Sequence, residues 1–177
     1  MFSLLLSTVL LAVIGAHAET HEVTFTNNCG FGTPMLIQGP NVLSTGGTFV
    51  SNGPLISAIA YLQTGKTAFL PYISLETSAN AYIFEGSCGF NGEGCTLVET
   101  TLVNPTTPGS GSSTDLSLIP PHSFSVTTGF GYFSGCDNTG ADCTSAGCVT
   151  AFDTPDQTDR QVACQSDNVN LAITFCD

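Results

Sequence analysis

The chain has 177 residues, and only two Lys or Arg stand against fourteen Asp or Glu, so the formal net charge is −12 at pH 7. A charge this negative repels phosphate backbones and anionic lipid surfaces, so it excludes nucleic acid and membrane surfaces as expected partners. The length suits one domain with a sizeable core.

The chain opens with an unbroken apolar run, MFSLLLSTVLLAVIGAHA, which ends in the small-x-small pattern that signal peptidase recognises. We predict that residues 1–18 are a signal peptide cleaved after Ala18 and that residues 19–177 form a single domain. The run is too short for a comfortable membrane span, and no later segment resembles one. We therefore expect a secreted protein, located extracellularly or in a cell wall.

Short strands are predicted along the whole of residues 19–177. In the first strand Val23 and Phe25 share one face while polar residues share the other, and the last strand, NLAITF, alternates in the same way. In chain order, the predicted strands cover 22–26, 34–38, 47–50, 55–62, 68–75, 80–85, 96–102, 115–119, 124–133, 160–164 and 170–175. No stretch has a helical period, so we predict an all-β fold, an antiparallel β-sandwich of about ten short strands.

One low-complexity segment, PTTPGSGSST at residues 105–114, lies between two predicted strands. We interpret it as an exposed loop, either plain or carrying O-linked sugars. Asn104 is not an N-glycosylation acceptor because Pro105 follows it, and residues 19–177 hold no other Asn-x-Ser/Thr site.

The cysteines predict four disulfides, because an even number of this size in an exported protein implies a disulfide framework. They are Cys29, Cys88, Cys95, Cys136, Cys143, Cys148, Cys164 and Cys176. No pair has the spacing of a zinc site, and His21 and His122 are far apart in the sequence. A cut after Ala16 would create an amino-terminal His17 of the kind that binds copper, but Ile14 disfavours that cut. We expect no metal and no cofactor.

Three stretches together resemble the thaumatin-like (osmotin) family. They are VTFTNNCGFGTP near the start, TLVETTL at 96–102 with TDLSLIPPHSFSV at 114–126, and the closing VACQSDNVNLAITFCD. The chain has fewer cysteines than the family, so it resembles a small, shortened, fungal-type member. The resemblance implies that residues 137–163 are the reduced remnant of the family's second domain.

The resemblance also implies a disulfide pairing. Cys29 is expected to bond Cys176 and thereby join the first strand to the last. Cys88 is expected to bond Cys95, and Cys136 to bond Cys164, which leaves Cys143 to bond Cys148.

Members of the family have an acidic cleft that in some of them binds or hydrolyses β-1,3-glucan. Glu99 in TLVET matches the cleft Glu, and Asp115, which opens DLSL, matches the first cleft Asp. The second cleft Asp falls near His122. Asp156 is the best match for the late cleft Asp, with Asp159 as the fallback.

Glycoside hydrolysis generally needs one protonated carboxyl group and one ionised one. The resemblance assigns these catalytic roles to Glu99, as acid, and Asp115, as base. The family's basic strand position falls near Ala58, so the cation that would help to fix the carboxylates is missing, and binding is favoured over hydrolysis. The alternatives are an ordinary polar residue on a half-exposed strand for Glu99 and a turn acceptor for Asp115.

Three further residues are candidate ligand-binding groups, each with a structural alternative. His122 follows two prolines and is otherwise a surface histidine in a turn. Tyr132 in GFGYFSG offers a ring to pack against sugar CH groups, or else belongs to the core. Asp156 lies in a segment that Pro155 keeps from being helical, so a solvated loop is its alternative.

These observations predict a secreted, monomeric thaumatin-like protein that binds cell-wall β-1,3-glucan in an acidic groove, with weak β-glucanase or antifungal activity as an additional expectation. The alternative is a non-enzymatic secreted effector or surface protein that binds another protein and has no sugar site.

Overall fold

The structure is a computed structural model that describes residues 18–68, 83–85 and 88–177. The predicted signal peptide, apart from Ala18, lies outside the described residues, as does most of the strand predicted at 68–75. The described part of the chain contains no helix that is long and apolar enough to cross a membrane.

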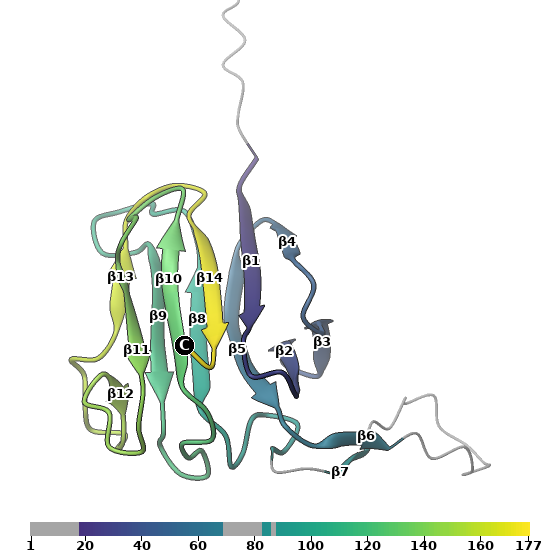
Figure 1. Ribbon diagram of the computed structural model, residues 1–177. Coiled ribbons are helices and arrows are strands. Elements are labelled where there is room, and N and C mark those ends of the chain that lie inside the picture. The colour runs from purple at the N-terminus through teal and green to yellow at the C-terminus, as the bar shows by residue number, and fades with distance from the viewer. Residues whose placement is uncertain (1–17, 69–82, 86–87) are drawn as a thin grey trace, which may run out of the picture.

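The described residues form fourteen strands and no helix, as the sequence predicted for an all-β chain (Figure 1). The strands are β1 (Thr20–Asn27), β2 (Thr33–Gln38), β3 (Asn41–Ser44), β4 (Phe49–Asn52), β5 (Leu55–Gln63), β6 (Lys66–Ala68), β7 (Ile83–Glu85), β8 (Leu97–Leu102), β9 (Ser112–Ser117), β10 (Thr128–Phe133), β11 (Gly140–Cys143), β12 (Ala151–Phe152), β13 (Val162–Cys164) and β14 (Asn170–Phe175). Strands β3, β11 and β12 have no predicted counterpart. They are short edge strands with little apolar alternation.

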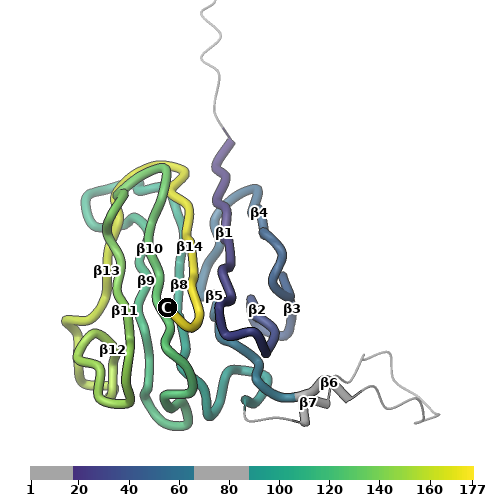
Figure 2. The backbone as a smooth tube through the Cα atoms, viewed as in Figure 1, coloured from purple at the N-terminus to yellow at the C-terminus, as the bar shows by residue number. Residues whose placement is uncertain are grey.

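Two sheets pack face to face, as the course of the backbone in Figure 2 shows. One sheet has the order β11-β10-β14-β1-β4. The other has the order β12-β9-β8-β5-β2-β3, with β13 also bonded to β9. The sandwich is mostly antiparallel, with two exceptions: β1 runs parallel to β14, and β12 runs parallel to β9.

The main core lies between the two sheets and follows from the period-two alternation of their strands. Val23 and Phe175 project into it from one sheet, and Leu36, Val98 and Leu116 from the other. Each fully buried side chain of this size contributes about 1.5–3 kcal/mol relative to leaving it exposed.

A second, smaller apolar cluster lies on the opposite face of the larger sheet. It consists of Met35, Ile37, Tyr61, Cys88, Cys95 and Leu97. The Tyr61 hydroxyl donates a hydrogen bond of 2.8 Å to the carbonyl of Phe90, which ties the loop closed by Cys88 and Cys95 to the sheet. This loop covers part of an outer face that would otherwise expose apolar side chains of β2, β5 and β8.

All four implied disulfides are confirmed. Three of them are Cys29–Cys176, Cys88–Cys95 and Cys143–Cys148. The fourth, Cys136–Cys164, joins the turn after β10 to the end of β13 and so connects the two sheets. No described cysteine is free. Four disulfides are consistent with an extracellular protein.

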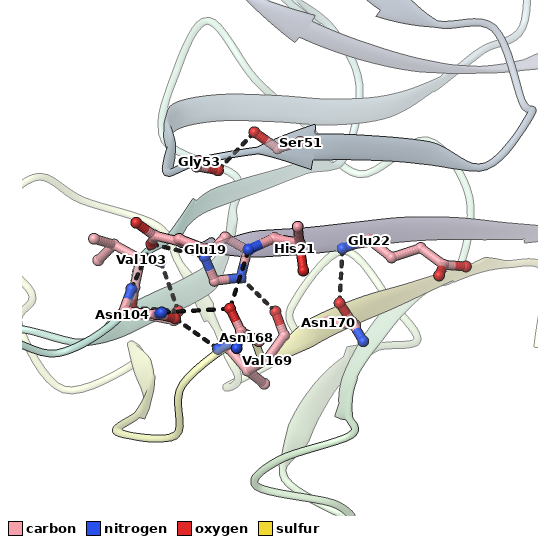
Figure 3. Close-up of polar contacts among 12 residues, drawn as sticks. Glu19, His21, Glu22, Ser51, Gly53, Val103, Asn104, Asn168, Val169 and Asn170 are labelled. Carbon is pink, nitrogen blue, oxygen red and sulfur yellow. Dashed lines mark hydrogen bonds and ion pairs between the residues drawn. The ribbon is translucent and has the colours of Figure 1, made fainter. Parts of the chain in front are cut away.

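A polar network fixes the start of β1 to two loops (Figure 3). The buried imidazole of His21 contacts the carbonyl of Val169 through Nδ1 at 2.7 Å and a Glu19 carboxylate oxygen through Nε2 at 3.0 Å. The same Glu19 oxygen accepts a 2.6 Å bond from the backbone N–H of Asn104, and Asn168 Oδ1 accepts one from the N–H of Thr20. The network therefore ties Glu19 and Thr20 to the loops that contain Asn104 and Asn168.

Strand β9 begins three residues earlier than predicted, inside the segment interpreted as a loop. Ser112 and Thr114 are buried there because their hydroxyls are satisfied. The Ser112 hydroxyl donates to the carbonyl of Val103, and the Thr114 hydroxyl bonds that of Thr100 at 2.6 Å. The exposed-loop prediction is therefore wrong for residues 112–114, because polar side chains with partners can enter a strand as readily as apolar ones.

Candidate functional site

The two predicted catalytic carboxylates lie side by side on the outer face of the larger sheet. Glu99 of β8 pairs directly with Asp115 of β9, and Ile59 of β5 pairs with Glu99 from the other side. Directly opposite residues of antiparallel strands have Cβ atoms about 4.5–5.5 Å apart and project on the same face. The register therefore brings together two carboxylates that are sixteen positions apart in the sequence.

A second row of polar residues runs alongside this one. Thr101 of β8 pairs with Ser113 of β9, each two residues from the carboxylate on its own strand. The hydroxyl oxygen of Thr101 accepts a 3.0 Å hydrogen bond from the backbone N–H of Ser57. Ser57 has a φ of 52° at the irregularity where the pairing of β5 shifts, and the exposed chain there forms the rim.

These residues line an open pocket of about 520 Å³. Its lining is Ser57, Ala58, Ile59, Glu99, Thr100, Thr101, Ser113, Asp115 and Gln161. No Lys, Arg or aromatic residue is among these lining residues, so the pocket offers hydroxyl, carboxyl and amide groups and the two aliphatic residues Ala58 and Ile59.

Asp115 is much more buried than its surface position on a sheet would suggest, since its exposed fraction is only 6%. Strand β12 pairs with Leu116 on one side of it, and β13 pairs with Thr114 on the other. The chain returns to the sheet between these pairings through Gln161, whose side chain hydrogen-bonds the carboxylate. Asp115 Oδ1 nevertheless has no hydrogen-bond partner among the described residues.

The environment of Asp115 favours its protonated form. Burial, and then the negative charge of Glu99, raise the pKa of Asp115 to about 7, while the hydrogen bond from Gln161 partly opposes them. Asp115 is therefore the group suited to hold a proton near neutral pH. Of the two carboxyl groups, Asp115 is the more deeply buried.

The position matched to the family's cleft cation supplies none here. Ala58 has no exposed surface and belongs to the core between the sheets. The guanidinium of Arg160 lies next to Gln161 in the sequence, but its Nη1 contacts the exposed carboxylate of Asp159 at 3.3 Å. No group of three or more His, Cys, Asp or Glu suited to a metal occurs among the residues described.

The other predicted ligand-binding residues do not join the pocket lining. Tyr132 is 4% exposed and belongs to the core between the sheets, where its hydroxyl donates to the carbonyl of Val162 at 2.9 Å and bonds Thr114 at 3.0 Å. Its assignment as a ligand-binding ring is corrected by this placement, because an alternating strand turns it inward. The core alternative describes it.

Asp156 and His122 also lie outside the lining. Asp156 is exposed in the loop between β12 and β13, which leads away from the sheet. Hydrogen bonds from Thr154 and from its own backbone N–H lower the pKa of Asp156. His122 is half-buried, and its Nδ1 lies 3.0 Å from the carbonyl of Gly92 in the loop closed by Cys88 and Cys95.

Among the lining residues that the sequence did not single out are Ser113 and Gln161. Ser113 lies two positions before Asp115, so the period of a strand would have placed both on one face had β9 been recognised to begin at Ser112. Gln161 has no such signal, because only the return of the chain along the edge of β9 brings it to Asp115.

The architecture as a whole is a thaumatin-like fold: two mostly antiparallel sheets, a parallel pairing of the first and last strands, and a disulfide joining those strands. A solved thaumatin-like xylanase inhibitor, TLXI, is similar to it, with a TM-score of 0.55 over 88% of this chain and 99% of that one and a sequence identity of 19%. No protein-family model matches the chain. A search of curated protein sequences likewise finds no match.

Proposed function

We propose that this protein is secreted and binds an uncharged cell-wall polysaccharide, β-1,3-glucan, in the pocket formed by β5, β8 and β9. The observation that carries the proposal is the cross-strand pair of Glu99 and Asp115 in an open pocket lined by further hydroxyl and amide groups. Sugar hydroxyls both donate and accept hydrogen bonds, and this lining offers both kinds of partner.

The charge of the protein points to the same class of glycan. A net charge of −12 and two carboxyl groups in the pocket disfavour uronic-acid or sulfated polymers. Because no aromatic side chain lines the pocket, the affinity for one sugar unit rests on hydrogen bonds. A polymer presents the same sugar unit many times, so a protein that leaves one unit can rebind at the next.

Binding is a better match to the pocket than hydrolysis. Two carboxyl groups on directly opposite residues have a separation compatible with a glycosidase pair, in which about 5–10 Å separates them. However, the described lining holds no cation or aromatic ring to fix a sugar in a strained conformation. Weak glucanase or antifungal activity remains secondary to binding in this proposal.

The test is a pull-down with insoluble β-1,3-glucan combined with a measurement of released reducing sugar. The wild-type protein is expected to sediment with the glucan and to release little sugar, and Glu99→Gln to sediment several-fold less. Asp137→Asn, which removes an exposed charge from the turn between β10 and β11 of the other sheet, is the matched control and should bind like the wild type. Equal binding by Glu99→Gln would show that the pocket is not the glucan site.

The alternative function is binding of another protein. The similar structure TLXI is described as a xylanase inhibitor, so this fold can act on an enzyme. Exposed apolar side chains such as Val149 and Phe31 would serve such contacts. If changes in the pocket leave glucan binding intact but Val149→Ser abolishes it, the binding surface is the exposed loop that contains Val149 and not the pocket.

A further inference from the structure

Two buried polar atoms of the pocket lack a partner, and both belong to one strand. Ser113 and Asp115 are two residues apart on β9, so they project on the same face, and both line the pocket. Ser113 Oγ and Asp115 Oδ1 are inaccessible to solvent and have no hydrogen-bond partner among the described residues. Buried polar groups are nearly always satisfied, so a neighbouring pair of exceptions in a pocket needs partners that the described residues do not supply.

The groups around Asp115 decide which chemical form it takes. Glu99 faces it from β8, the Gln161 side chain faces it from the segment before β13, and Tyr132 of β10 lies behind it on the core side of β9. None of these is cationic. An ionised Asp115 would therefore face Glu99 with only the Gln161 hydrogen bond to offset the repulsion, whereas a protonated Asp115 can donate a hydrogen bond.

Asp115, Glu99 and Ser113 then offer a ligand both hydrogen-bond donors and hydrogen-bond acceptors. A protonated Asp115 is a donor, the carboxyl oxygens of Glu99 are acceptors, and the Ser113 hydroxyl is both. Two neighbouring hydroxyls of a sugar ring are complementary to such a set, since each of them is also both donor and acceptor. A carboxylate or sulfate ligand is not complementary, because it cannot donate to Glu99.

We propose that Ser113 and the protonated carboxyl group of Asp115 form a subsite for a vicinal diol of an uncharged sugar, so that glycan binding requires a proton on Asp115 and is lost in alkaline solution. This inference rests on the proposed glucan function and assigns Asp115 as a hydrogen-bond donor rather than as a catalytic base. The raised pKa of Asp115, about 7, places the transition near neutral pH.

The sign of the dependence follows from linkage. A ligand that binds only the protonated form loses affinity tenfold for each pH unit above the pKa of that group and is insensitive well below it. For a pKa of about 7, the protonated share falls about tenfold between pH 6 and pH 8. Asp115→Asn keeps a donor of the same shape that never ionises, so it should bind equally at both pH values.

The experiment is calorimetric titration with a soluble β-1,3-gluco-oligosaccharide between pH 5.5 and 8.5. The wild type is expected to lose about tenfold in affinity from pH 6 to pH 8. Asp115→Asn should bind at pH 8 about as tightly as the wild type at pH 6. Ser113→Ala should bind several-fold more weakly at every pH with the wild-type profile, and Asp137→Asn should match the wild type throughout.

A ligand-free measurement keeps the inference independent of glucan. The ¹³C shift of the Asp115 carboxyl group should titrate near neutral pH, and titration near its ordinary pKa of 3.8 would overturn the inference. Wild-type binding that does not change with pH, or loss of binding by Asp115→Asn at pH 6, would overturn the inference alone. Absence of binding at every pH would overturn the proposed function and, with it, this subsite.

Discussion

The bond between Cys29 and Cys176 offers the sharpest test of how this fold is stabilised, because it closes a loop that spans 147 positions. In the chain-entropy account, a disulfide destabilises the unfolded state by an amount that grows with the logarithm of loop length. For this loop the account gives about 5 kcal/mol. The bond between Cys143 and Cys148 spans 5 positions, for which the same relation gives about 2 kcal/mol.

The perturbation is the double substitution Cys29→Ser and Cys176→Ser, with Cys143→Ser and Cys148→Ser as the matched control. The native topology should survive the first change because β1 and β14 remain paired through five registered positions, from Val23 opposite Leu171 onward. The loss of stability should therefore come from the greater conformational entropy of the unfolded chain.

The assay is reversible thermal unfolding followed by circular dichroism. A protein of this size loses roughly 2–4 °C of melting temperature per kcal/mol, so the long-loop variant should melt roughly 10–20 °C lower and the short-loop variant only about 4–8 °C lower. Equal losses in the two variants would refute the loop-length reasoning and would point to local strain or packing at each bond instead.

Two further predictions concern buried polar groups. Tyr132→Phe removes the hydroxyl that bonds Val162 and Thr114, and it should lower the unfolding free energy by about 1–3 kcal/mol in denaturant titrations, more than Tyr61→Phe, which loses one bond; equal losses would contradict this. Burial alone would raise the pKa of Glu19, but hydrogen bonds from His21 and Asn104 outweigh it and lower that pKa, so the stabilisation is present above the ordinary value of 4.5 and is lost as the pH falls. Glu19→Gln should therefore be less stable than the wild type by about 1 kcal/mol at pH 6, and the difference should disappear once the pH falls below the lowered pKa of Glu19, whereas a constant difference would exclude the carboxylate as its cause.

The strand content was predictable because alternation is a local signal. Val23 and Phe25 at the start and Leu171, Ile173 and Phe175 at the end show the period of a half-buried strand, and both segments form strands. The edge strands β11 and β12 gave no such signal. Strands β11 and β12 are held by pairing with β10 and β9 and not by their own apolar pattern, so only the tertiary structure reveals them.

The candidate site was predictable only as far as residue types. Glu99 and Asp115 could be selected from the resemblance of their segments, and the register then places them opposite one another. Gln161 could not be found, because its contact with Asp115 is a long-range consequence of how β13 returns along β9. For Tyr132 the residue type was misleading. An aromatic ring can pack against a sugar, but the register of β10 turns this ring into the core.

The roles of the two carboxyl groups show why residue matching alone gives an incomplete picture of a site. Both groups lie in one cross-strand row, yet β12 and β13 cover only the side on which Asp115 lies. A cation beside the pair would favour ionisation of both carboxyl groups and create a charged site. With Ala58 buried in the core and no cation in the described lining, burial and the charge of Glu99 instead raise the pKa of Asp115 to about 7, and this is why we propose an uncharged ligand that accepts a hydrogen bond from Asp115.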